Sequence, residues 1–91
     1  MAKRKVSKLQ DIPNIGKAIE KDLHSIGIHV PNDLVGKDPI TLYKTLNKKT
    51  RTRHDPCMLD TFMAAVDYMN GAPERPWFFY TKKRKVEYPN I

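Results

Sequence analysis

The stretch Ile12-Pro13-Asn14-Ile15-Gly16 lies between two segments of helical hydrophobic spacing and decides the fold class of this chain. Pro13 and Gly16 force a turn there. Asn14 takes a turn position at which asparagine tolerates the left-handed backbone conformation better than any residue except glycine. Behind the turn, over 16–26, apolar residues recur at spacings of four and three, at Ile19, Leu23 and Ile26. The pattern predicts a short helix over 7–11, a tight hairpin turn and a second helix.

Helix start signals mark the segments that follow. Pro31 suits the first position of a short helix that Gly36 can end. Asp38-Pro39 and Asp55-Pro56 each join a capping side chain to a residue preset for the first helical turn. The helix after Pro56 carries the longest apolar stripe: Leu59, Phe62, Met63, Val66 and Met69. With Ser7 as a cap for the first short helix, five helical segments and no strand pair predict a compact all-α domain.

Composition divides the chain into three parts. Residues 1–6 form a basic N-terminal arm, 7–71 the helical domain, and 72–91 a tail rich in proline, aromatic and basic residues. We expect this tail to be extended, with Trp77 and its neighbours packed back onto the helices as a clasp. The run Lys82–Lys85 is expected to be mobile, since like charges repel each other.

The overall composition favours an acidic partner. The 91 residues include 17 Lys and Arg against 10 Asp and Glu, a net charge of +7, which points to nucleic acid first and an anionic surface second. Cys57 is the single cysteine, so an internal disulfide and a disulfide-stapled secreted scaffold are excluded. No run approaches the ~20 apolar residues of a membrane span. We expect a cytoplasmic monomer of one domain, too small for an elaborate enzyme pocket.

The hairpin has the chemistry of an anion site. The second helix begins at the turn, so its first amide groups and the positive end of its dipole face outward. Gly16 stands where a Cβ would block a close approach to the backbone. A phosphate of a nucleic-acid backbone fits such a site, with Lys17 beside it.

This segment resembles the helix-hairpin-helix motif of DNA-repair and recombination proteins. The turn of that family usually reads Pro-Gly-Ile-Gly, so Asn14 departs from the pattern and adds a side chain near the phosphate. The resemblance implies phosphate contacts from the amides of Gly16, Ala18 and Ile19. It also implies, for some members, a monovalent cation on hairpin carbonyls, which here correspond to Gln10, Ile12 and Ile15.

The resemblance extends over residues 7 to 80. The succession carrying it is Leu34-Val35, Asp38-Pro39, Leu42-Tyr43, Leu46, Arg53-His54-Asp55-Pro56-Cys57, Leu59, Phe62, Ala64-Ala65-Val66 and Arg75-Pro76-Trp77. It is similar to the small bacterial pathogenicity-locus proteins, some labelled mitomycin-resistance proteins, and to the C-terminal domain of bacterial competence regulators. That family implies a helix-hairpin-helix (SAM-like) fold and DNA binding. The basic tail after residue 80 lies outside the resemblance.

The sequence thus predicts a DNA-binding module that recognises backbone phosphates without reading base sequence. The contacts are expected at the hairpin and in two basic runs: Asn14, Gly16, Lys17, Ala18, Ile19, Lys48, Lys49, Arg51, Arg53, Lys82, Lys83, Arg84 and Lys85. Two alternatives stay open. The hairpin and the aromatic clasp could instead dock another protein, as in a helical adaptor, and the basic runs could be ordinary solvated loops. The aromatic residues 77–80 could stack on unpaired bases or pack inward.

His54, Asp55 and Cys57 are the residues that would support an enzyme. Cys57 lies near the positive end of a helix dipole, which is expected to lower the pKa of its thiol. Asp55, however, is explained as the helix cap, and with one cysteine a zinc site lacks ligands. We therefore predict no enzymatic activity, no metal and no cofactor.

Overall fold

The computed structural model describes residues 6–91, so the basic arm predicted over 1–6 lies outside the described residues except for Val6. The described chain forms four α-helices and three 3-10 helices: η1 (Leu9–Asp11), α1 (Lys17–Ser25), η2 (Pro31–Leu34), α2 (Pro39–Thr50), α3 (Pro56–Met69), η3 (Trp77–Tyr80) and α4 (Thr81–Glu87). Over 6–91 there is no strand, which confirms the all-α prediction. None of these helices is long and apolar enough to cross a membrane.

The five predicted helical segments all form, although two are single 3-10 turns rather than α-helices. The Asp-Pro signals act as expected: Asp38 accepts a hydrogen bond from the Ile40 amide, and Asp55 accepts one from the Cys57 amide at 2.8 Å. The predicted cap at Ser7 is wrong. Asp11, at the other end of η1, accepts from the backbone amides of both Ser7 and Lys8.

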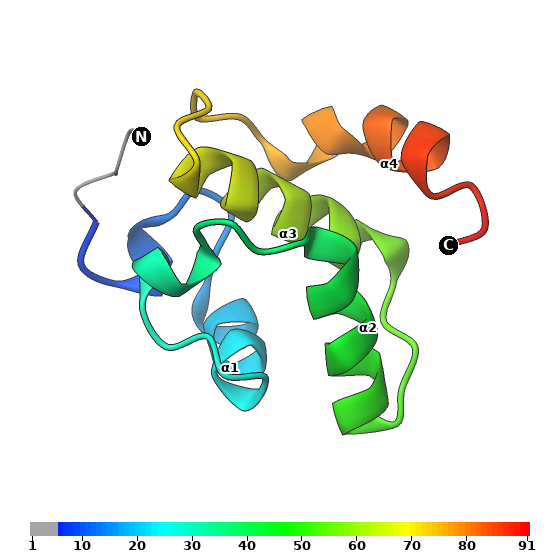
Figure 1. Cartoon of the computed structure of the whole chain (residues 1–91), viewed down its shortest axis with the longest axis horizontal. Helices are drawn as coiled ribbons and strands as arrows, with labels where there is room; N and C mark the ends of the chain where they lie inside the picture. The colour runs from blue at the N-terminus through cyan, green and yellow to red at the C-terminus, as the bar shows by residue number, and fades with distance from the viewer. Residues whose placement is uncertain (1–5) are drawn as a thin grey trace.

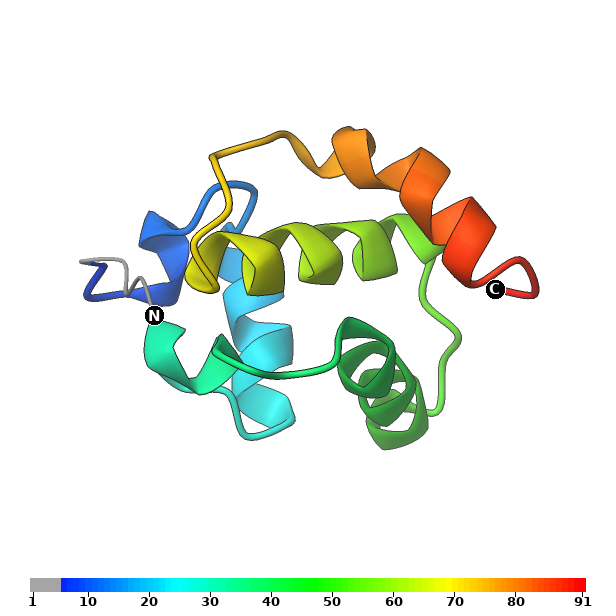
Figure 2. The ribbon, with the colours of Figure 1, turned by 45° about the horizontal axis from the view of Figure 1, so that its top comes forward.

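Helix α3 is the centre of the fold. Figures 1 and 2 show it running between α1 and α2 on one side and the η3–α4 segment on the other. It packs against η2, α2, η3 and α4. Residues 59–66 are buried on every face of the helix, as is typical of a helix surrounded by protein. The fold is therefore a set of short elements arranged around one buried helix.

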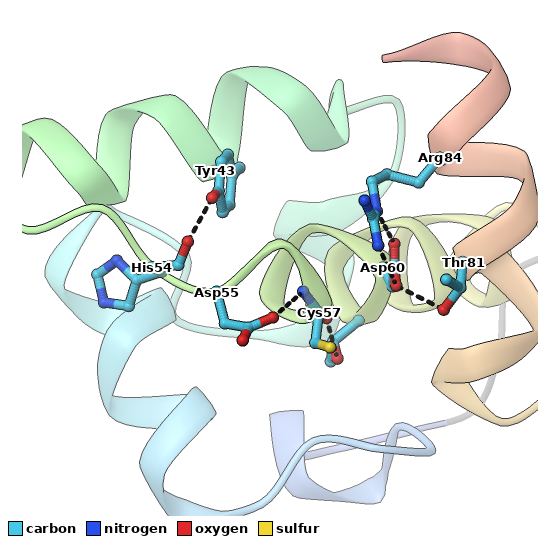
Figure 3. Close-up of polar contacts among 8 residues, drawn as sticks. Tyr43, His54, Asp55, Cys57, Asp60, Thr81 and Arg84 are labelled. Atoms are coloured by element: carbon cyan, nitrogen blue, oxygen red, sulfur yellow. Dashed lines mark hydrogen bonds and ion pairs between the residues drawn. The ribbon is translucent and has the colours of Figure 1, made fainter. Parts of the chain in front are cut away.

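The C-terminal tail is not extended, contrary to the prediction. Residues 72–76 and 88–91 lack helical structure, and η3 and α4 lie between them. The reason is Asp60, which is fully buried in α3 and needs partners, because an unpaired buried charge is costly. Arg84 Nε donates to it at 2.8 Å and Thr81 Oγ1 donates at 2.7 Å (Figure 3). Helical spacing brings both donors to one face of α4, so the basic run is folded against α3.

Candidate nucleic-acid interface at the hairpin

The hairpin turn has the geometry that its sequence predicts. Asn14 has a φ of 74°, in the left-handed region, and the buried Ile12 and Ile15 anchor the turn on either side. The Ile15 amide donates to the Ile12 carbonyl at 3.2 Å. That bond engages one of the three carbonyls proposed for a monovalent cation.

Gly16 is not required by the protein's own structure. Its φ of −100° and ψ of −173° are extended values that any residue adopts. Apart from Gly16 and its two neighbours in the chain, a Cβ added there would find no heavy atom of the described residues within 4 Å. The missing side chain therefore leaves open space on the outside of the hairpin.

The start of α1 is left open to a ligand. Gly16 is its N-cap residue and supplies no side-chain hydrogen bond. The first intrahelical bond runs from the Glu20 amide to the Gly16 carbonyl, so the amides of Lys17, Ala18 and Ile19 have no helical acceptor. Glu20, the acidic residue of this turn, accepts a hydrogen bond from Gln10 Nε2 at 2.8 Å. Two of the predicted amides, those of Ala18 and Ile19, thus lie at an exposed helix start together with the Lys17 amide, and Gly16, the third predicted residue, is the N-cap.

The Asn14 side chain has a role that the sequence did not reveal. Its Nδ2 donates to the Arg75 carbonyl at 2.9 Å, and its Oδ1 accepts from the Trp77 amide at 3.2 Å. Both polar atoms are thus used inside the protein, tying the hairpin to the segment before η3. Asn14, the residue that departs from the Pro-Gly-Ile-Gly pattern, thus links the hairpin to a distant part of the chain.

A cavity of about 450 Å³ lies beside this link. Its walls come from the hairpin turn, α1, the start of α3 with the residues just before it, and η3. In that order the lining residues are Asn14; Ile19; His54, Asp55, Cys57, Met58 and Thr61; and Trp77. Sequence reasoning did not bring these walls together, because they come from four separate stretches of chain. The cavity makes the hairpin, the α3 start and the aromatic segment one continuous region.

The residues considered for catalysis have structural partners. Tyr43 Oη donates to the His54 carbonyl (Figure 3), and Asn47 Oδ1 is 2.7 Å from His54 Nδ1. The bond from the Cys57 amide lowers the pKa of Asp55. Over residues 6–91, no group of three or more His, Cys, Asp or Glu side chains could hold a metal ion.

The expected lowering of the pKa of Cys57 is wrong. A side-chain hydrogen bond to Asp55, together with burial and the negative charges of Asp55 and Asp60, raises the pKa of its thiol. The capping carboxylate of Asp55 lies beside the thiol, and a nearby negative charge favours the neutral form. The structure therefore gives Cys57 the surroundings of an unreactive thiol.

The predicted basic residues fall into separate groups. Lys48, Lys49, Arg51 and Arg53 are exposed at the end of α2 and on the loop to α3, and that loop leads into His54 at the cavity. Lys82, Lys83 and Lys85 are exposed on α4, on the other side of α3. Arg84 differs from them: only 8% of it is exposed, and its ion pair with Asp60 leaves the guanidinium unavailable to a phosphate.

Comparison with known proteins covers nearly the whole chain. Residues 2–86 match the family described as Pathogenicity locus (Cdd1). The chain belongs to this family. It is 40% identical over 79 residues to the mitomycin resistance protein McrB of Streptomyces lavendulae, a match that covers 87% of this chain and 75% of that protein. No solved structure matches.

The family match extends beyond the resemblance over 7–80. It runs through Arg84 to residue 86 and so takes in most of α4, which the sequence had placed outside the resemblance. The contact between α3 and α4 thus lies within the part of the chain that the Pathogenicity locus family covers.

Proposed function

We propose that this Pathogenicity locus protein binds DNA without sequence preference, through phosphate contacts at the start of α1. The observation that carries the proposal is the open helix start at Gly16, with three amides that have no helical acceptor and free space where a side chain would be. The starts of α2 and α3 are closed by Asp38 and Asp55. An uncapped helix start binds phosphate well because its amides and dipole favour negative charge.

The order of elements supports the same proposal. A short helix η1, a turn with Asn14 in the left-handed region, and α1 follow the helix-hairpin-helix plan. We assign the domain to the SAM-like helix-hairpin-helix class and propose its kinship with the C-terminal domain of competence regulators. Mitomycin resistance, which names the S. lavendulae relative, is a proposed context and names no molecular activity.

The charge of the chain supports an electrostatic mode of binding. Lys17 and Lys21 are exposed on α1, and the net charge is +7. A single hairpin makes few contacts, so we expect dissociation constants of about 10⁻⁴–10⁻⁶ M at physiological salt. Lys82, Lys83 and Lys85 on α4 provide a second, weaker attraction.

A salt titration of binding to a labelled duplex tests the proposal. Affinity should fall linearly with salt on logarithmic axes. Gly16→Asp should lower affinity about tenfold or more, because its carboxylate takes the amides and repels the phosphate. Asn90→Asp makes the same change in net charge at the exposed C-terminal end and is the matched control.

The second arm replaces Lys82, Lys83 and Lys85 with glutamine and keeps Arg84. This variant should retain the salt-dependent binding at reduced strength. If it loses binding completely while Gly16→Asp behaves like Asn90→Asp, α4 is the binding element and the assignment to the hairpin is wrong.

A helical adaptor is the second candidate function, favoured by the exposed aromatic residues Trp77, Phe78 and Phe79, which are 36%, 63% and 53% exposed. Large exposed aromatic side chains are enriched at protein interfaces. An adaptor predicts no salt-dependent DNA binding and a protein partner that a Phe78→Ala variant no longer retains in a pull-down.

A further inference from the structure

The cavity beside Asn14 has features that a phosphate contact leaves unused. Its apolar walls include Ile19 on α1, Met58 on α3 and Trp77 in η3. Its volume of about 450 Å³ falls within the range of sites for small organic groups. A phosphate, which needs polar partners, gains nothing from such walls. The cavity is suited to a flat, largely apolar group.

Trp77 is the wall that is best placed for stacking. Its side chain is 36% exposed, and its amide is held by Asn14 Oδ1 at 3.2 Å. Phe78 lies edge-on to the indole, with ring centroids 5.8 Å apart and planes at 85°. The partly exposed indole thus lines the cavity with a second ring packed against it, and proteins that bind single strands stack bases on such aromatic side chains.

Few polar atoms in the walls are left without a partner. The Thr61 hydroxyl donates to the Cys57 carbonyl at 3.0 Å, and both polar atoms of Asn14 are used. His54 Nδ1 pairs with Asn47 Oδ1, so Nε2 is the ring nitrogen with no partner in the described part of the chain. The cavity is thus lined by an aromatic stacking surface and by His54, whose Nε2 is left for a base edge.

The charges around the cavity indicate what the flat group is attached to. Lys17 lies two residues before Ile19, Arg53 directly precedes His54, and Arg75 lies two residues before Trp77. Lys17 and Arg53 are exposed and Arg75 lies over the Phe79 ring at 4.5 Å, so basic residues adjoin the lining residues along the chain. Asp55, the acidic lining residue, accepts from the Cys57 amide. A flat group joined to phosphates matches this charge, and an apolar peptide does not.

We propose that the cavity between α1, the start of α3 and Trp77 receives one unpaired DNA base, stacked on the indole. Ile19 connects the two sites, because its amide belongs to the open start of α1 and its side chain lines the cavity. A base within a duplex is stacked on both faces and paired at its edge, so the ligand is single-stranded or locally opened DNA. The inference rests on the proposed function and narrows it to that substrate class.

The experiment compares two single strands of equal charge. One is a twelve-unit thymidine strand, and the other is a twelve-unit strand of the same sugar and phosphate that lacks bases. Binding of both to the full chain is measured by competition against one labelled strand at fixed salt. Trp77 is the single tryptophan, so its fluorescence reports directly on the cavity. We expect the thymidine strand to bind about tenfold more tightly and to quench Trp77, as one stacked base would.

Three variants locate the effect. Trp77→Ala should bring the ratio of the two affinities to about one, because the stacking surface is gone. Trp77→Phe should restore part of the ratio, which separates stacking from a general loss of structure. Phe79→Ala removes another exposed aromatic ring from η3 that does not line the cavity, and it should leave the ratio unchanged.

The outcomes separate this inference from the proposed function. If the wild-type ratio is one, or if Trp77→Ala preserves a high ratio, the base site is wrong. Should duplex binding still fall with salt and with Gly16→Asp in that case, the phosphate site at α1 stands alone. If neither strand nor the duplex binds, both proposals are overturned.

Discussion

The start of α1 and the start of α3 border the same cavity, but a side chain caps only one of them. At α3, Asp55 accepts from the Cys57 amide, and further along the helix Asp60 is paired with Arg84 and Thr81. At α1, Gly16 provides no cap and its surroundings are empty. One region satisfies its polar groups within the chain, while the first amides of the other have no helical acceptor.

On the proposed function, this difference separates stability from binding in a small domain. The central helix holds the core, so its polar groups must be satisfied on folding, because an unpaired buried group is costly. The α1 start is exposed, where water satisfies its amides at little cost until a ligand replaces it.

Asp60→Ala tests the closed region and should have the largest effect. It leaves Arg84 nearly buried without its partner, and such a loss costs about 3–5 kcal/mol of unfolding free energy. Urea denaturation measures this loss. Replacing both residues by apolar ones, Asp60→Leu with Arg84→Met, should recover much of it. A loss below about 1 kcal/mol for Asp60→Ala would show that α4 is not held by this pair.

Asn14 ties the turn before the open region to the segment before η3, and its substitutions should have the next largest effect. Asn14→Ala removes two hydrogen bonds and replaces a residue that tolerates a φ of 74° by one that tolerates it poorly. We expect a loss of about 2–4 kcal/mol. Asn14→Gly relieves the backbone and loses only the bonds, about 1–2 kcal/mol. Equal losses for the two variants in thermal melts would mean that the turn conformation contributes nothing.

Gly16→Asp converts the open start into a closed one. Because the extended backbone and the empty surroundings accept an aspartate cap, we expect the unfolding free energy to rise by about 0.3 kcal/mol. DNA affinity should fall at the same time. Denaturation and binding curves measured on one preparation show whether stability rises while affinity falls. A Gly16→Asp variant that loses both stability and affinity contradicts the view that this helix start is open and unstrained.

The Cys57 thiol should show the smallest effect. Its raised pKa means that the folded protein favours the neutral thiol, so iodoacetamide should react more slowly with the folded chain than with the urea-unfolded chain near neutral pH. Stability should decline as the pH rises through the pKa of the unfolded thiol. Asp55→Asn removes the carboxylate and should speed alkylation, whereas Asp38→Asn, the equivalent change at α2, should not.

Local signals in the sequence predicted most of the fold. The Asp-Pro pairs and the apolar stripe of 59–69 are short-range features, and they marked α2 and α3 correctly. Helix α4 was missed because Lys82–Lys85 has the composition of a solvated run. Only the pairing of Arg84 with Asp60, 24 residues away, shows that one member of that run belongs to the core.

The site was predicted less completely, because it too depends on contacts between residues far apart in the sequence. The left-handed turn at Asn14 followed from its residue type, but its side-chain partners lie 61 and 63 residues away. The pKa of Cys57 was predicted to be lowered, whereas it is raised, because the prediction considered the helix dipole and not the adjacent carboxylate of Asp55. The cavity walls come from separate stretches of the chain that meet only in the folded protein, so no local sequence pattern predicts them.

The long reach of the Asn14 bonds has a consequence for the order in which the protein matures. The hairpin is translated 61 and 63 residues ahead of Arg75 and Trp77, the partners of its Asn14 side chain. The turn therefore gains these two hydrogen bonds only after the segment before η3 has been synthesised. A chain that stops before Arg75 carries the hairpin sequence without these bonds.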